Sequence, residues 1–265
     1  MVSEDMIRTT TATRYVTPLR EGGSLPAIVE ADDDGLYVLK FRGAGQGPKA
    51  LIAELVAGEI ARALGLPVPE IVFMELDPVL GRTEPDFEIQ ELIKASAGLN
   101  LALDFLPGAL AFDVVDAHNL EPLLASSILW FDAYVTNVDR TPRNTNMLWW
   151  HRRLMLIDHG ASLYFHHVNA NYIERSRTPF TRIKEHILLP RASRIAEVDT
   201  LLKARLNQVL IQDIINMIPD PWLDNDPLFV DSHAHRAAYI SYLLDRLTYS
   251  HIFVEEAMRA REQLI

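Results

Sequence analysis

The sequence predicts an α+β fold with two lobes, a small antiparallel sheet followed by a larger and mostly helical lobe. Short alternating apolar segments with turn signals between them dominate the first part of the chain, as in antiparallel strands. Longer segments with helical apolar spacing follow from about residue 121. With 265 residues, 49% of them hydrophobic, the chain can bury two lobes. We assign 1–13 to an N-terminal tail, 14–93 to the smaller lobe and 94–265 to the larger lobe.

Three strands are expected at the start of the smaller lobe, over Arg14–Thr17, Ala27–Glu30 and Leu36–Phe41. A strong turn signal, Asp32–Gly35, separates the second strand from the third. Gly22, Gly23 and Ser24 lie between the first two strands. Glycine lets backbone N–H groups approach phosphate oxygens closely, so this segment is a candidate phosphate contact, with a plain hairpin turn as the alternative.

Lys40 ends the third strand, where a lysine is costly unless its ammonium group reaches water or a partner. The alternative is an edge-strand lysine that points to solvent. A helix is expected to follow from Pro48 to Leu64. On that helix Glu54 shares a face of small side chains, whereas Glu59 lies nearer larger ones. Periodicity alone allows either glutamate to pair with Lys40.

The larger lobe contains the strongest chemical signal. A helix expected over Glu121–Val135 leads into a loop with Asp139 and, five residues on, Asn144. Two short apolar strands should follow, over Asn146–Trp150 and Leu154–Asp158, joined by the polar turn 151–153. Such a hairpin would return Asp158 to the side of Asn144.

These three side chains match the requirements of phosphoryl transfer. One carboxylate, here Asp139, orients the attacking hydroxyl and accepts its proton, while an amide oxygen and a second carboxylate, Asn144 and Asp158, hold Mg²⁺. A lysine paired with a helix acid contacts the phosphates of ATP, as expected for Lys40. An aspartate and an asparagine five residues apart are common in surface turns, so the prediction depends on the whole set.

The connection between the lobes is expected at residues 94–98, after a strand over Phe87–Ile93. In this interpretation backbone groups of Glu91 and Ile93 contact the adenine of ATP. Long helices are expected over Ile195–Met217 and Ser232–Arg261, and these would complete the larger lobe. An H-x-H element at His233 and His235 falls on the second of these helices, where side chains two apart diverge, so a metal-hydrolase site is not expected.

Several segments together resemble one family. They are Tyr37–Phe41, Ala53-Glu54-Leu55, Ala63–Pro69, Asn137 through Asn144, and Ile157–Gly160. These segments resemble HipA-type kinases over about residues 14 to 165. Gly22-Gly23-Ser24-x-Pro26 and Asp158-His159-Gly160 are similar to the shorter HipA-like branch, without the toxin's extra N-terminal domain.

The resemblance implies a two-lobed protein-kinase-like fold, ATP with Mg²⁺, and Ser/Thr phosphorylation of a protein partner. It implies that Lys40 contacts phosphates and that Glu54, in preference to Glu59, holds Lys40. It also implies catalysis by Asp139 and metal binding by Asn144 and Asp158. The chain departs from the family at Thr141, where a histidine is common. A small-molecule kinase of the same broad fold and a non-catalytic nucleotide-binding adaptor remain alternatives.

Composition excludes other classes of function. The net charge is −11, with 25 Lys and Arg against 36 Asp and Glu, which argues against a general binder of nucleic acid or of anionic membranes. The chain has no cysteine, which excludes disulfides, cysteine-ligated zinc and thiol catalysis. Residues 1–13 lack the pattern of a signal peptide, and no apolar run reaches membrane-spanning length, so we expect a cytoplasmic protein.

Overall fold

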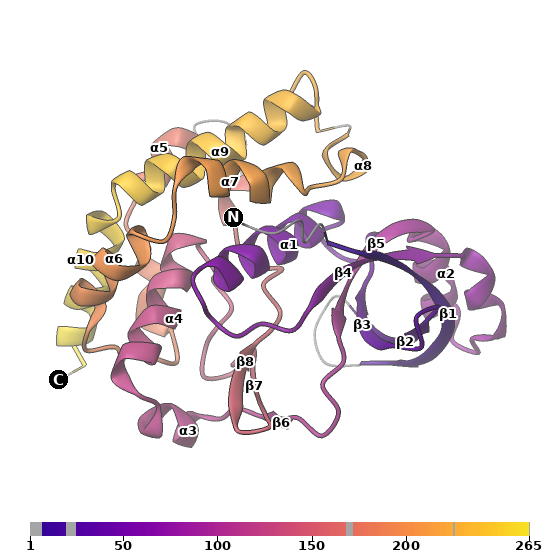
Figure 1. Cartoon of the computed structure of the whole chain (residues 1–265), viewed down its shortest axis with the longest axis horizontal. Coiled ribbons are helices and arrows are strands. Elements are labelled where there is room, and N and C mark those ends of the chain that lie inside the picture. Colours follow the sequence, from indigo (N-terminus) through magenta and orange to yellow (C-terminus); the bar gives the residue numbers. More distant parts are fainter. Residues whose placement is uncertain (1–6, 20–24, 168–171, 225, 265) are drawn as a thin grey trace. The chain divides into compact units, whose positions relative to one another are not determined.

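The computed structural model describes residues 7–19, 25–167, 172–224 and 226–264 (Figure 1). The chain divides into two compact units, described separately below. Unit 1 comprises residues 1–55 and 69–108, and unit 2 comprises residues 56–68 and 109–265. The boundary falls inside one helix, α1 (Pro48–Ala63), and its second half belongs to unit 2.

Unit 1 is built around a closed barrel with the strand order β1-β2-β3-β5-β4 (Figure 1). The strands are β1 (Thr9–Pro18), β2 (Ala27–Ala31), β3 (Leu36–Lys40), β4 (Ile71–Leu76) and β5 (Gly98–Asp104). Neighbouring strands are antiparallel, except that β1 and β4 pair in parallel and close the barrel. The first two strands predicted from the sequence are confirmed as parts of β1 and β2, and the third is confirmed as β3, which ends at Lys40, one residue earlier than predicted.

The first strand begins earlier than predicted. Residues 9–13 were assigned to the tail, but Thr9–Thr11 pair with Phe73–Glu75 of β4. Threonine is β-branched and suits a strand. Thr10 and Ala12 alternate inward and are each only 4% exposed. This part of the strand was not predicted because its inward positions carry small or polar side chains, which give no alternating apolar pattern.

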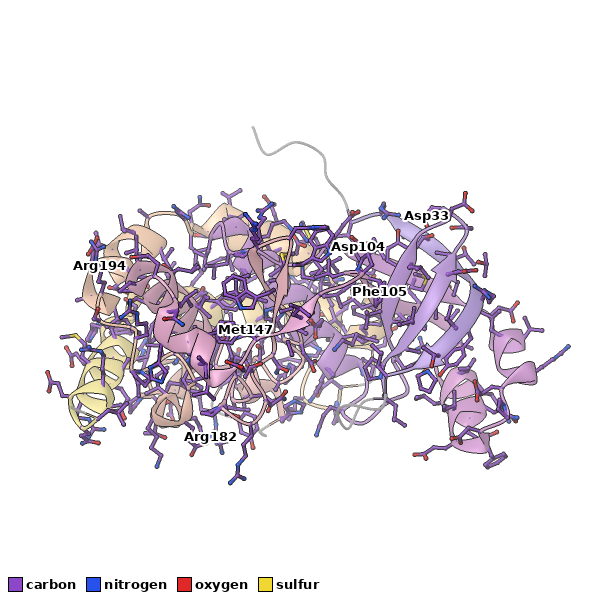
Figure 2. The ribbon with its side chains drawn as sticks, turned by 90° about the horizontal axis from the view of Figure 1, so that it is seen from below. Asp33, Asp104, Phe105, Met147, Arg182 and Arg194 are labelled. Carbon is purple, nitrogen blue, oxygen red and sulfur yellow. The ribbon has the colours of Figure 1, made fainter. Side chains whose placement is uncertain are left out.

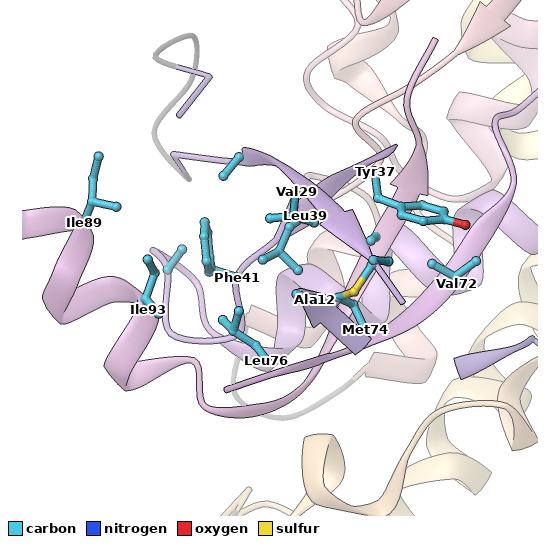
Figure 3. Packing of buried hydrophobic residues seen from close by; sticks show 14 residues of the cluster. Ala12, Val29, Tyr37, Leu39, Phe41, Val72, Met74, Leu76, Ile89 and Ile93 are labelled. Carbon is cyan, nitrogen blue, oxygen red and sulfur yellow. The ribbon is translucent and has the colours of Figure 1, made fainter. Parts of the chain in front are cut away.

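The interior of the barrel is packed with apolar side chains (Figure 3). Alternate residues of each strand contribute, such as Val29 of β2, Leu39 of β3 and Met74 of β4, all fully buried. Because Leu39 points inward, its neighbour Lys40 points to the opposite face of the sheet. This alternation places Lys40 on the outside of the barrel.

The strand predicted over Phe87–Ile93 is wrong, because these residues form helix α2 (Phe87–Ala95). Apolar residues at positions 87, 89 and 93 fit an alternating pattern, but Ile89 and Ile93 are also one helical turn apart and pack on the barrel core (Figure 3). Asp86 caps the helix by accepting a hydrogen bond from the N–H of Glu88 at 3.0 Å. Phe87 is 72% exposed, so its apolar side chain misled the prediction.

Unit 2 contains a small sheet and most of the helices (Figure 1). Its sheet has the order β6 (Leu110–Ala111), β7 (Met147–Trp150) and β8 (Arg153–Leu156). Its helices are α3 (Val114–Asn119), α4 (Pro122–Tyr134), α5 (Tyr172–Ser176), α6 (Ile195–Lys203), α7 (Gln208–Asn216), α8 (Asp220–Leu223), α9 (Ser232–Thr248) and α10 (His251–Glu262). Short 3₁₀ helices complete the chain: η1 (Pro78–Thr83) in unit 1, and η2 (Tyr164–His167) and η3 (Thr181–Glu185) in unit 2.

The two long helices predicted for this unit are each interrupted. The first divides into α6 and α7, because Asn207 caps α7 by accepting a hydrogen bond from the N–H of Leu210 at 3.0 Å. The second divides into α9 and α10 at Tyr249 and Ser250. Among the described residues, no helix combines the length and the apolar composition that crossing a bilayer requires.

Candidate active site

The predicted hairpin of unit 2 is confirmed as β7 and β8, which pair antiparallel from Met147 opposite Leu156 to Trp150 opposite Arg153. Its turn is shorter than predicted. Only His151 and Arg152 form it, both with positive φ (48° and 64°), which is typical of a type I′ hairpin turn. Asparagine and glycine usually occupy such positions, so the sequence did not reveal that Arg153 already belongs to the strand.

The hairpin brings Asp158 next to the residues before β7. The N–H of Ile157 donates to the carbonyl of Asn146 at 3.0 Å, which extends the pairing beyond the strands. The side-chain nitrogen of Asn146 also lies 3.5 Å from the carbonyl of Asp158. Asp158 itself has φ = 56°, a left-handed conformation that aspartate tolerates better than most residues.

The loop between α4 and β7 curls tightly around Asp139. Thr141 and Asn144 exchange two backbone hydrogen bonds, at 2.9 and 3.1 Å. This bridge turns the side chain of Asn144 back, and its Nδ2 donates to Asp139 Oδ2 at 2.6 Å. The four residues between Asp139 and Asn144 therefore form a closed turn that holds the two side chains together. Because the Asn144 amide nitrogen faces Asp139, its oxygen is the atom that a cation would use.

Asn146 also belongs to this cluster, although its sequence position did not predict this. It is 8% exposed, has φ = 48°, and its Nδ2 lies 3.4 Å from Asp139 Oδ2 as well as near the carbonyl of Asp158. Asn146 thereby links the loop of Asp139 to the end of the hairpin. The sequence offered one indication of this role, a second asparagine two positions after Asn144. Its position next to an apolar segment instead predicted the first residue of a strand.

The surroundings of Asp139 alter the protonation of its carboxylate. Burial raises the pKa of Asp139, and the nearby charge of Asp158 raises it further, against the hydrogen bonds from Asn146 and Asn144. The net effect is a pKa above the ordinary value, chiefly because burial disfavours the charged carboxylate, with a smaller contribution from the negative charge of Asp158. A divalent cation would relieve the repulsion between the two carboxylates.

The donor set fits Mg²⁺ or a similar hard cation, since it offers carboxylate and amide oxygens. Among the described residues, no group of three or more His, Asp or Glu side chains is placed to hold a metal ion. A protein-only metal cage is therefore not formed in this part of the chain. Mg²⁺ is commonly held by one or two carboxylates together with substrate phosphates and water, and Asp158 and Asn144 match that arrangement.

A buried network of charged and polar side chains holds the loop that contains Asp139. The Asp132 carboxylate, at the end of α4, accepts hydrogen bonds from Arg140 Nε at 2.6 Å, His186 Nε2 at 2.9 Å and Asn137 Nδ2 at 2.8 Å. The N–H of Leu188 donates to His186 Nδ1 at 3.1 Å, so Nε2 carries the proton given to Asp132. Arg140 also donates to the carbonyl of Asn146. The network thus fixes both ends of the loop that presents Asp139.

Ionisation of Asp132 depends on its partners. Burial alone would raise the pKa of Asp132, but the charge of Arg140 and the hydrogen bond from His186 outweigh burial and hold the pKa below its ordinary value. The side chains of Asp132 and Arg140 are both fully buried. A buried ion pair of this kind is stabilising only while both partners are present.

In unit 1, Lys40 and Glu54 form an ion pair. Lys40 Nζ lies 3.8 Å from Glu54 Oε2, and the side chains are 11% and 2% exposed. The separation exceeds a hydrogen bond, so the contact is a charge interaction across a short gap. Glu59 instead pairs with Arg62, at 3.2 Å. Of the two glutamates that periodicity allowed, the structure places Glu54 beside Lys40.

Two groups of predicted nucleotide contacts are not placed by the structure. Gly22, Gly23 and Ser24 lie outside the described residues. Of the residues on either side of them, Leu19 donates its N–H to the carbonyl of Pro26 at 2.7 Å. Glu91 and Ile93 belong to α2, where Ile93 is fully buried. The backbone N–H and carbonyl groups of residues inside a helix are hydrogen-bonded within that helix. The adenine contact predicted for these residues required a strand over Phe87–Ile93, and this segment is a helix. The strand that lies between β3 and β4 in the barrel is β5.

Similar solved structures share this fold at low sequence identity. A Helicobacter pylori proinflammatory kinase, CtkA, is 14% identical, with a TM-score of 0.57 over 98% of this chain and 100% of that chain. A Golgi casein kinase with Mn and ADP bound is 12% identical, with a TM-score of 0.55 over 94% of this chain and 74% of that chain. These likenesses confirm the predicted protein-kinase-like fold, with an N-terminal β-sheet lobe and a helical C-terminal region.

Sequence comparison identifies the family. No curated protein matches the sequence significantly. The family described as HipA-like kinase matches residues 13–256, which is nearly the whole chain and includes both Lys40 and the cluster around Asp139. The predicted resemblance is confirmed, and the chain belongs to the HipA-like kinase family.

Proposed function

We propose that this protein is an ATP- and Mg²⁺-dependent phosphotransferase that moves the γ-phosphate to a serine or threonine hydroxyl of a protein. The observation that carries the proposal is the contact of Asp139 with Asn144 and Asn146 at the end of the hairpin that delivers Asp158. A member of a kinase family that keeps this cluster has the groups that phosphoryl transfer requires.

In this proposal each residue has one role. Asp139 accepts the proton of the attacking hydroxyl, and its hydrogen bonds from Asn144 and Asn146 hold the carboxylate in place. Asn144 and Asp158 hold the metal through oxygen atoms. Mg²⁺, when bound, neutralises charge on the phosphates. Asn146 orients Asp139 by its hydrogen bond, and Lys40, held by Glu54, contacts the phosphates.

The direct test is incubation of the purified chain with γ-labelled ATP, Mg²⁺ and a cell lysate, followed by mapping of labelled peptides. Label on serine or threonine of a protein, lost when EDTA removes Mg²⁺, is the expected result. Label confined to small molecules would favour the metabolite-kinase alternative. Binding of ATP with no transfer to any acceptor would favour a nucleotide-binding adaptor.

Replacing Asp158 with alanine should weaken Mg²⁺-dependent binding of ATP by about tenfold or more, because the variant loses one metal-binding carboxylate. Calorimetry with and without Mg²⁺ measures the effect. The variant should bind ATP almost equally under the two conditions, whereas the unaltered protein should bind more tightly with the metal. Equal Mg²⁺ dependence in both proteins would contradict the role of Asp158.

The two glutamates of α1 provide a matched pair of variants. Glu54→Gln removes the charge beside Lys40 and should lower kcat/KM for ATP by about tenfold, since the lysine loses the partner that orients it. Glu59→Gln should leave kcat/KM nearly unchanged, because Glu59 contacts Arg62 instead. Steady-state kinetics at varied ATP compares them, and similar losses in both variants would rule out a specific role for Glu54.

A further inference from the structure

A pocket of about 930 Å³ lies within unit 2 beside Asp139. Three segments line it: the loop from Val138 to Asn144, helix α3, and the stretch from Arg182 to Arg191. Asp139 and Asn144 both face this pocket, so a group bound there lies next to the proposed proton acceptor. The volume is within the range of about 300–1,000 Å³ that is common for ligand sites.

The charge of this pocket is opposite to that of the chain. Arg143, Arg182, Lys184 and Arg191 line it, against the carboxylates of Asp139 and Glu185. The chain as a whole carries a net charge of −11. A local excess of cations in an acidic protein creates an attractive field for anions at that position, and repulsion elsewhere directs anions toward it.

Most of these cations are available to a ligand. Arg182 pairs with Glu185 at 3.0 Å and is at the surface of unit 2 (Figure 2), so its charge is partly neutralised. Arg191 donates from Nε to the carbonyl of Leu120 at 2.6 Å, which holds the guanidinium in place without neutralising it. Within the described ranges, no carboxylate lies at ion-pair distance from Arg143, Lys184 or Arg191.

We infer that this pocket binds the phosphate acceptor and selects a polypeptide segment with acidic side chains next to the hydroxyl. The inference rests on the proposed phosphotransferase function and specifies its substrate class. The acceptor hydroxyl approaches Asp139, while flanking carboxylates pair with Arg143 of the loop and with Lys184 and Arg191 of the facing stretch. Phosphorylated side chains offer the same anionic chemistry, and the experiment below separates them from carboxylates.

The test uses peptides that contain one serine flanked by glutamates, glutamines, lysines or phosphoserine analogues. The unaltered protein should phosphorylate the glutamate peptide at least about tenfold more efficiently in kcat/KM than the lysine peptide. The double variant Arg143→Glu/Lys184→Glu should reverse this preference, and both side chains are exposed, so folding should be preserved. Lys203→Gln, a charge removed outside the pocket, should keep it. A preference for the phosphoserine analogue over glutamate would identify phosphate as the recognised anion.

A binding measurement separates this inference from the proposed function. Fluorescence anisotropy with the same labelled peptides requires no turnover, and acid-selective binding that weakens with salt supports the pocket even if phosphoryl transfer fails. Transfer to all peptides regardless of their charge would overturn the pocket inference and leave the kinase proposal standing. Equal binding of glutamate and lysine peptides, or transfer only to small anionic molecules, would also overturn it.

Discussion

Replacing Asp139 with asparagine is expected to reduce phosphoryl transfer by about 10²–10⁴-fold while ATP binding stays nearly unchanged. Asparagine has almost the same shape as aspartate, and its amide oxygen can still accept the hydrogen bonds from Asn144 and Asn146. The loop should therefore keep its conformation. The amide cannot accept a proton at neutral pH, so the loss falls on kcat and not on the affinity for nucleotide.

The measurement compares initial rates of transfer with ATP affinity from calorimetry in the presence of Mg²⁺. Asp213→Asn is the matched control, because Asp213 is an exposed aspartate on α7 and lies outside the cluster. The control should keep both rate and affinity. Turnover of Asp139→Asn equal to that of the unaltered protein would reject Asp139 as the proton acceptor. A loss of ATP binding in parallel with activity would instead indicate a structural role.

Much of the fold was predictable because local signals agreed with tertiary structure. Helix α4 extends over Pro122–Tyr134, as expected from the proline at its start and its apolar spacing. Glu121 caps the helix, and the N–H of Leu124 donates to its carboxylate at 2.9 Å. The strands β2 and β3 and the hairpin of β7 and β8 follow alternating patterns between turn residues. In these segments propensity, periodicity and burial all indicate one structure.

The sequence-based predictions failed where one segment fits both a strand and a helix pattern, or where contacts distant in sequence determine the structure. The segment Phe87–Ala95 satisfies both the strand and the helix period, and packing of Ile89 and Ile93 on the barrel selects the helix. The sequence could not place Asn146 in this cluster, because its contact with Asp158 forms only when the β7–β8 hairpin folds. The pairing of Lys40 with Glu54 needed family resemblance, since helical periodicity left Glu59 equally open.

Removal of the Asp132 side chain should strongly destabilise unit 2. Asp132→Ala leaves the fully buried guanidinium of Arg140 without its carboxylate, and removes the acceptor of His186 and Asn137. Breaking a buried ion pair from one side costs about 3–5 kcal/mol in the free energy of unfolding. The loop of Asp139 should loosen as well, because Arg140 connects Asp132 to the carbonyl of Asn146.

This loss should depend on pH in a defined direction. The partners of Asp132 hold its folded-state pKa below the ordinary value, so its ionised form stabilises the protein fully above the ordinary aspartate pKa of about 3.9. That contribution disappears as the pH falls through the folded-state pKa. Urea unfolding at pH 7 and at successively lower pH should show that the difference in the free energy of unfolding between the unaltered protein and Asp132→Ala becomes smaller in acid.

Asp199→Ala is the comparison. Asp199 accepts one partly buried hydrogen bond from Trp130 Nε1 at 2.8 Å, so its removal should lower the free energy of unfolding by only about 1 kcal/mol. Similar losses in both variants, or a gap that widens in acid, would contradict the view that Arg140 and His186 depend on an ionised Asp132.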